Sequence, residues 1–105
     1  MGLFGLFGSK KPEKTAQISA FFSAEDLQRI REVIEPKVNS IAYGKYTSLA
    51  QVLLDAVKHP EMTVSPKDLV SMNSVLGAVG AMRKMEPGLK DILNAAIEKM
   101  RAFRD

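Results

Sequence analysis

The chain of 105 residues contains no cysteine and a single histidine, His59. Without cysteine there is neither a disulfide framework nor a thiolate, which suits a reducing compartment. His59 precedes Pro60, and no pair of acidic residues stands at a catalytic spacing, so a nucleophile, a base and an orienting group cannot be assembled. We therefore expect a protein that is not an enzyme, with no catalytic, cofactor-binding or metal-binding residues and no small-molecule substrate.

Long hydrophobic runs are lacking as well. No stretch approaches the roughly 18 apolar residues that span a bilayer, and the short apolar run at the N-terminus precedes its lysines, whereas a signal peptide has its basic residues first. A glycine loop that cradles phosphate is also lacking, because Gly77 and Gly80 fall inside a helical pattern. These absences predict a cytoplasmic protein that is at most peripheral to a membrane.

The composition is that of an ordinary globular protein, with 46% hydrophobic and 26% charged residues. The formal net charge of +3 is unevenly distributed along the chain. Residues 15–82 hold six basic and seven acidic groups, whereas the two ends of the chain are basic. We expect residues 1–15 to be a flexible apolar and basic tail, and residues 16–105 to form one domain.

Residues 2–8 read Gly-Leu-Phe-Gly-Leu-Phe-Gly and are followed by a short basic stretch. Apolar side chains interrupted by glycine form helices poorly, and on a flexible end they favour contact with a partner. We expect this segment to dock on a membrane surface or in a groove of a partner protein; the alternative is a segment without function. The predicted docking residues are Leu3, Phe4, Leu6, Phe7, Lys10, Lys11 and Lys14.

One copy of this segment would bind weakly. Burying four leucine and phenylalanine side chains yields at most roughly 6–12 kcal/mol, and ordering about seven residues costs nearly as much. Three lysines near an anionic leaflet add about 1 kcal/mol each. Several copies held together would bind far better than one, so we expect a homo-oligomer.

The domain is predicted to be mainly α: a small helical bundle of four to five helices, with one short N-terminal β-strand over 17–22. Ser23 and Asp26 form a capping box ahead of an apolar stripe. This signal starts a helix predicted over 23–42, with a kink at Pro36, which lacks a backbone donor.

Three further helices follow in the predicted domain. Thr47 or Ser48 caps a helix over 48–58, and the sequence Ser65-Pro66-Lys67-Asp68 starts a helix over 66–85. The last helix, over 87–104, has an apolar face that predicts an antiparallel hairpin with the helix before it.

Gly77 and Gly80 lie inside the helix predicted over 66–85. Two glycines cost a helix about 2 kcal/mol relative to alanine, a loss that close approach of another element would offset. We favour a tight crossing within the chain, and keep a subunit interface or a flexible kink as the alternatives.

The block from Gln17 to Val57 resembles a ribbon-helix-helix repressor domain. The resemblance rests on an alternating six-residue run, the sequence Phe-Ser-Ala-Glu-Asp-Leu-Gln-Arg-Ile over 22–30, a glycine turn and a Thr/Ser-capped apolar helix. In that family two chains pair their strands into a ribbon that enters the major groove, and the N-terminus of the second helix holds a phosphate. The resemblance implies base contacts by Gln17, Ser19 and Phe21, and phosphate contacts near Thr47 and Ser48.

Taken together, the sequence predicts a non-catalytic, self-associating interaction module whose N-terminal Gly-Leu-Phe segment docks on a membrane surface or a partner protein. The alternative is a dimeric ribbon-helix-helix-like DNA-binding protein that uses Gln17, Ser19 and a basic N-terminal arm. The central block of the chain has a net charge of −1, which supplies few of the phosphate contacts that a strong DNA binder makes.

Overall fold

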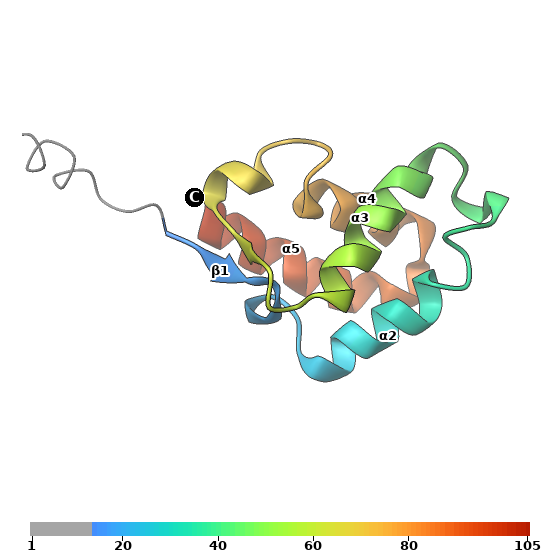
Figure 1. The fold of residues 1–105 in the computed structure, drawn as a ribbon, viewed down its shortest axis with the longest axis horizontal. Coiled ribbons are helices and arrows are strands. Elements are labelled where there is room, and N and C mark those ends of the chain that lie inside the picture. The colour runs from blue at the N-terminus through green and yellow to red at the C-terminus, as the bar shows by residue number, and fades with distance from the viewer. Residues whose placement is uncertain (1–13) are drawn as a thin grey trace, which may run out of the picture.

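A computed structural model describes residues 14–105 (Figure 1). This part of the chain forms four α-helices: α2 (Ala24–Ile34), α3 (Thr47–Lys58), α4 (Val75–Met85) and α5 (Lys90–Arg104). The 3₁₀ helices are η1 (Ile18–Ala20), η2 (Ile41–Tyr46), η3 (Pro66–Leu69) and η4 (Pro87–Leu89). Two short strands, β1 (Ala16–Gln17) and β2 (Thr63–Val64), pair antiparallel. The predicted fold class, a small and mainly α-helical bundle with one short N-terminal strand, is confirmed.

The strand predicted over 17–22 is much shorter than expected. β1 pairs Ala16 with Val64 and Gln17 with Thr63 of the same chain. The chain then tightens into η1, where the backbone N–H of Ser19 donates to the carbonyl of Pro60 (3.0 Å). Successive residues of a strand point to opposite faces of the sheet. Phe21 and Phe22 are both buried, so the alternation of buried and exposed side chains does not continue to residue 22.

Helix α2 begins as predicted but ends early. The Ser23 hydroxyl accepts a hydrogen bond from the backbone N–H of Asp26 (3.1 Å). The helix ends at Ile34 and does not run to residue 42, because Pro36 has no N–H to continue the ladder. The N–H groups of Lys37 and Val38 both return to the carbonyl of Ile34, so the chain leaves the helix in turns.

The helix predicted over 66–85 is two elements, η3 and α4. The sequence Ser-Met-Asn-Ser over 71–74 lies between them in a turn. The Ser71 hydroxyl accepts from the N–H of Asn73 (3.1 Å) and the Ser74 hydroxyl from that of Gly77 (3.2 Å). Serine and asparagine side chains compete for backbone groups in this way, so Ser74 caps a new helix and the earlier one does not continue.

The predicted C-terminal antiparallel hairpin is formed by α4 and α5, joined through η4 (Figure 1). Arg83 donates to the side-chain carbonyl of Asn94 across the hairpin (2.9 Å). α3 packs against both α2 and α4, and the shared core includes the fully buried side chains of Ile30, Leu53, Met82, Leu93 and Met100. No helix within residues 14–105 combines the length and the apolar character needed to cross a membrane.

Candidate functional site

Residues 14–105 contain no group of three histidine, cysteine or carboxylate side chains that could hold a metal ion. His59 is exposed at the C-terminal end of α3, and its Nδ1 lies 3.5 Å from a carboxylate oxygen of Glu61. As the C-cap residue of α3, His59 donates its backbone N–H to the carbonyls of Asp55 and Ala56.

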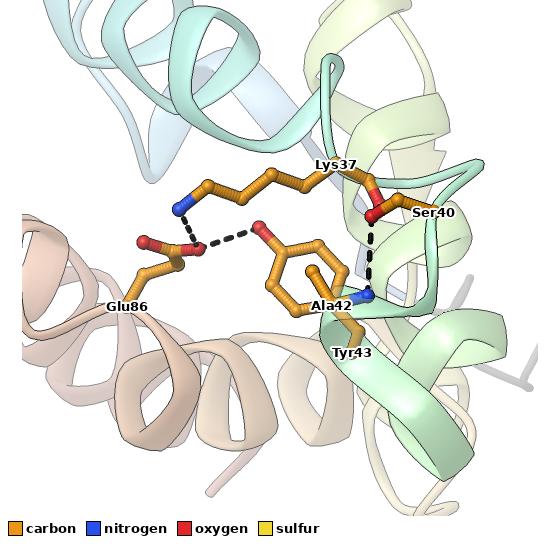
Figure 2. Close-up of polar contacts among 5 residues, drawn as sticks. All are labelled: Lys37, Ser40, Ala42, Tyr43 and Glu86. Atoms are coloured by element: carbon orange, nitrogen blue, oxygen red, sulfur yellow. Dashed lines mark hydrogen bonds and ion pairs between the residues drawn. The ribbon is translucent and has the colours of Figure 1, made fainter.

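The most buried carboxylate of the described chain, Glu86, accepts two hydrogen bonds on one oxygen (Figure 2). The Tyr43 hydroxyl and the Lys37 ammonium both donate to its Oε2, each at 2.8 Å. Tyr43 belongs to η2, whereas Glu86 lies at the corner between α4 and η4. The three side chains therefore fasten the connection between α2 and α3 to the C-terminal hairpin.

The Tyr43 phenol has the acid–base behaviour expected of a structural contact. The pKa of the Tyr43 phenol is raised well above its ordinary value. Burial is the largest cause, and the hydrogen bond to Glu86 is the next. Tyr43 is thus a hydrogen-bond donor that gives up its proton less readily than an ordinary tyrosine. Lys37, Tyr43 and Glu86 line neither the hollow between α2 and the end of α3 nor the two hollows beside α4.

Two hollows meet on the outer surface of α4. One, of about 460 Å³, lies between the 69–72 turn, α4 and the C-terminal half of α5. The other, of about 340 Å³, lies between α4 and the start of α3. Both are lined by Met72, Gly77, Gly80 and Arg83, so they form one continuous depression, which we call the α4 groove.

Apolar side chains and bare backbone form much of the α4 groove. Met72 is 86% exposed and Val70 71% exposed, although both are large hydrophobic residues. Leu76 is half-buried beside them. Gly80 forms an open floor, since a Cβ built on it would meet no atom within 4 Å. An apolar depression of this kind on a protein surface is typical of an interaction site.

The charge of the α4 groove has one sign. Its lining includes the four basic residues Arg83, Lys84, Arg101 and Arg104 and no carboxylate. Arg104 forms an ion pair with its neighbour Asp105 (3.1 Å), and Arg83 donates to Asn94. Within residues 14–105, neither Lys84 nor Arg101 lies within 4.0 Å of a carboxylate oxygen, so their charges face solvent.

A third hollow, of about 580 Å³ between α2 and the end of α3, is different because its charges compensate one another. Arg31 and Lys58 both lie close to Glu35, at 3.5 and 3.4 Å. The hydrogen bond from Lys58 is the main cause that lowers the pKa of the Glu35 carboxyl. With Glu32 also in its lining, this hollow is electrically balanced and does not select a partner by charge.

Most of the predicted docking segment cannot be placed. Leu3, Phe4, Leu6, Phe7, Lys10 and Lys11 lie outside the described residues. Lys14 is exposed, and its ammonium group lies 5.1 Å from the centroid of the Phe103 ring on α5. The described chain thus begins beside the C-terminal end of α5, and Figure 1 shows β1 at the same end of the molecule as the C-terminus.

The residues that the ribbon-helix-helix resemblance singled out have different environments. Gln17 and Ser19 are exposed on and after β1. Phe21 is only 4% exposed, and its ring packs edge-on against Phe103 with centroids 5.8 Å apart. Thr47 and Ser48 begin α3, and the Thr47 hydroxyl donates to the carbonyl of Gly44 (2.8 Å).

Gly77 and Gly80 are the predicted interface residues that the structure brings into the α4 groove. The close neighbour of Gly77 is the backbone of the 70–74 turn: a Cβ there would lie 2.0 Å from the carbonyl oxygen of Met72. Gly80 has no such neighbour and its surface is open. The sequence analysis missed Arg83 and Arg101, which belong to different helices; the basic C-terminal segment was the available signal.

The chain matches no protein-family model, no curated protein and no solved structure.

Proposed function

We propose that the protein is a non-catalytic interaction module that binds another macromolecule through the α4 groove. The observation that carries this proposal is the coincidence, in one groove, of exposed Met72 from the 69–72 turn, the bare backbone of Gly80 on α4 and the solvent-facing charge of Arg101 on α5. Apolar area supplies affinity at an interface, and charges around it supply orientation and choice of partner.

The shape of the groove supports a helical partner. Its floor is the face of α4 that carries Gly77 and Gly80. The Met72 backbone covers Gly77, so the open surface that lets a second helix approach closely is at Gly80. The walls of the groove are the 69–72 turn and α5 on one side and the start of α3 on the other. An amphipathic helix laid in an apolar groove is a recurring mode of peptide recognition.

The N-terminal docking segment and self-association belong to the same proposal. Leu3, Phe4, Leu6 and Phe7 would attach the module to a membrane surface or a second protein, and several copies together would make that attachment useful. Self-association through the α4 groove is disfavoured, because a two-fold interface places identical patches face to face and would bring Arg101 near Arg101 of a second copy.

Binding of duplex DNA is the second candidate. Gln17 and Ser19 are exposed, and the exposed basic residue Lys14 precedes them in the chain. This candidate requires salt-sensitive binding to duplex DNA that is lost when Gln17 and Ser19 are both changed to alanine. Absence of binding even at low salt would remove it.

The test of the interaction module uses an uncharged probe. We expect a peptide of about five helical turns, with one leucine stripe and glutamine elsewhere, to shift the backbone amide NMR signals of Gly77 and Gly80 in the full-length protein. Gly80→Leu fills the floor and should abolish these shifts, whereas Gln51→Leu, on the exposed side of α3, should leave them unchanged. Equal shifts in both variants would contradict binding at this groove.

A further inference from the structure

The α4 groove selects its partner by charge. Resting on the proposed function, we propose that its occupant is an acidic amphipathic helix of another protein, with an apolar stripe flanked by aspartate or glutamate residues. The apolar stripe would lie on the floor at Gly80, and the flanking carboxylates would meet the basic residues on the α5 wall and along α4 beside the floor.

The first argument is charge complementarity. Arg83 and Lys84 lie toward the end of α4, and Arg101 and Arg104 lie toward the end of α5. Arg104 is paired with Asp105, but no carboxylate lines the groove to neutralise the other three. Arginine binds carboxylates in a planar, two-point geometry, so an acidic helix would find donors on the α5 wall and, along α4, beside the floor.

The second argument is the apolar part of the groove. Met72 and Val70 project at the rim, and half-buried Leu76 and Ile97 of the core continue beneath them. Phosphate groups gain nothing from such side chains, whereas leucine or phenylalanine of an amphipathic helix would remove them from water. Methionine is unbranched and adapts to partners of different shape.

Two other occupants are disfavoured by the same charges. A second copy that docked through its own groove or through its N-terminal segment would present basic residues, since Lys10, Lys11 and Lys14 outnumber Glu13 in that segment. The chain's own N-terminal segment leaves the domain near the Arg104 end of the groove, but its charge has the same sign as the groove. An acidic partner therefore comes from a different protein.

The experiment compares three peptides on the full-length protein. All have about five helical turns and the same leucine stripe, with glutamate, glutamine or lysine on the flanks. By fluorescence anisotropy at about 50 mM salt we expect the glutamate peptide to bind roughly tenfold more tightly than the glutamine peptide, and the lysine peptide most weakly. The advantage of glutamate should shrink at about 300 mM salt, where charges are screened over a shorter distance.

Variants of two arginines test whether the preference for the glutamate peptide arises at the α4 groove. Arg101→Glu should weaken the glutamate peptide several-fold and leave the glutamine peptide nearly unchanged, and Arg101→Lys should restore part of the loss. Arg29→Glu makes the same change of charge at an exposed site on α2, outside the groove, and should have little effect. Circular dichroism of each variant establishes that the fold is intact.

The outcomes separate the two proposals. Equal affinity for the glutamate and glutamine peptides would overturn the acidic partner and leave the interaction module standing. Failure of all three peptides to bind would overturn both. Tighter binding of a duplex DNA or of phosphatidylserine vesicles than of the glutamate peptide, lost in Arg101→Glu, would overturn the acidic helix in favour of a phosphate-bearing partner.

Discussion

Gly77 and Gly80 look alike in the sequence and differ in the structure. A Cβ at residue 77 would lie 2.0 Å from the Met72 carbonyl oxygen, whereas a Cβ at residue 80 would meet no atom within 4 Å. The spacing of the two glycines predicts a close approach of another element but does not say which glycine is approached. The two glycines differ because the 70–74 turn places the Met72 carbonyl against Gly77. The helical periodicity of the sequence gives no sign of this turn.

Alanine at these two positions should have opposite effects on stability. Gly77→Ala must displace backbone and should lower the free energy of unfolding by about 1–3 kcal/mol. Gly80→Ala replaces a helix-interior glycine in open space and should raise it by up to about 1 kcal/mol. Urea unfolding followed by circular dichroism measures both, and a loss of stability in Gly80→Ala would contradict the open surface described for that residue.

Tyr43 should make the protein sensitive to alkaline pH. Its pKa is raised in the folded protein above the ordinary value of 10.0, so the folded state holds this proton more tightly than the unfolded state does. The resulting stabilisation is complete below about pH 10 and is lost as the pH rises above it toward the folded-state pKa.

Tyr43→Phe removes both the proton and the hydrogen bond to Glu86. It should lower the free energy of unfolding by about 2 kcal/mol at neutral pH, as expected for a hydrogen bond to a charged group. The difference between the two proteins should then narrow above about pH 10. Urea unfolding at a series of pH values gives this difference directly; a constant difference across the series would show that Tyr43 does not titrate as described.

At the scale of elements, the predicted ends at residues 58, 85 and 104 coincide with the ends of α3, α4 and α5, whereas the start of α4 and the early end of α2 were not predicted. Ser23 and the Ser65-Pro66 pair mark true starts, because a cap is a local interaction between residues three apart in sequence. The extent of a helix depends on what competes with it further along. The apolar period that predicts one helix over 66–85 is satisfied equally well by η3 and α4, which bury Leu69, Val79 and Met82 in one core.

Because the helix predicted over 66–85 is divided into η3 and α4, α4 needs an N-cap of its own, and this cap can be tested. Ser74→Ala removes the acceptor for the N–H of Gly77 and should lower the free energy of unfolding by about 1 kcal/mol. Asn73→Ala changes an exposed neighbour whose side chain makes no hydrogen bond within residues 14–105 and serves as the control. Equal effects of the two changes on urea unfolding would argue against a capping role.

At the scale of the molecule, the sequence predicts the class of fold but only part of the candidate site. Hydrophobic periodicity and helix caps in the sequence are sufficient to predict the helical bundle. The α4 groove could not be predicted from the sequence. Arg83 and Arg101 line the same surface only because the hairpin of α4 and α5 brings them together. Met72 is exposed, although its spacing in the sequence suits a helix core. Gly80 was singled out correctly as unusual, without the groove that surrounds it.

The N-terminal segment makes a prediction for the whole protein. Replacing Leu3, Phe4, Leu6 and Phe7 by serine should abolish sedimentation with anionic vesicles and leave the helical circular dichroism spectrum unchanged. The matched control replaces Ile41, which is 96% exposed in the domain, by serine. Undiminished sedimentation of the N-terminal variant would contradict the docking role.

The contact of Lys14 with Phe103 has a practical consequence for handling the protein. The entry of the chain into the domain and its exit from α5 lie at the same end of the molecule (Figure 1). A short flexible linker can therefore join residue 105 to residue 14, and new termini can be opened in the exposed turn at 39–40, outside the α4 groove, a site type that tolerates circular permutation. Such a permuted chain would carry the groove without a neighbouring tail, and a fusion partner attached to the original C-terminus would stand beside Arg104.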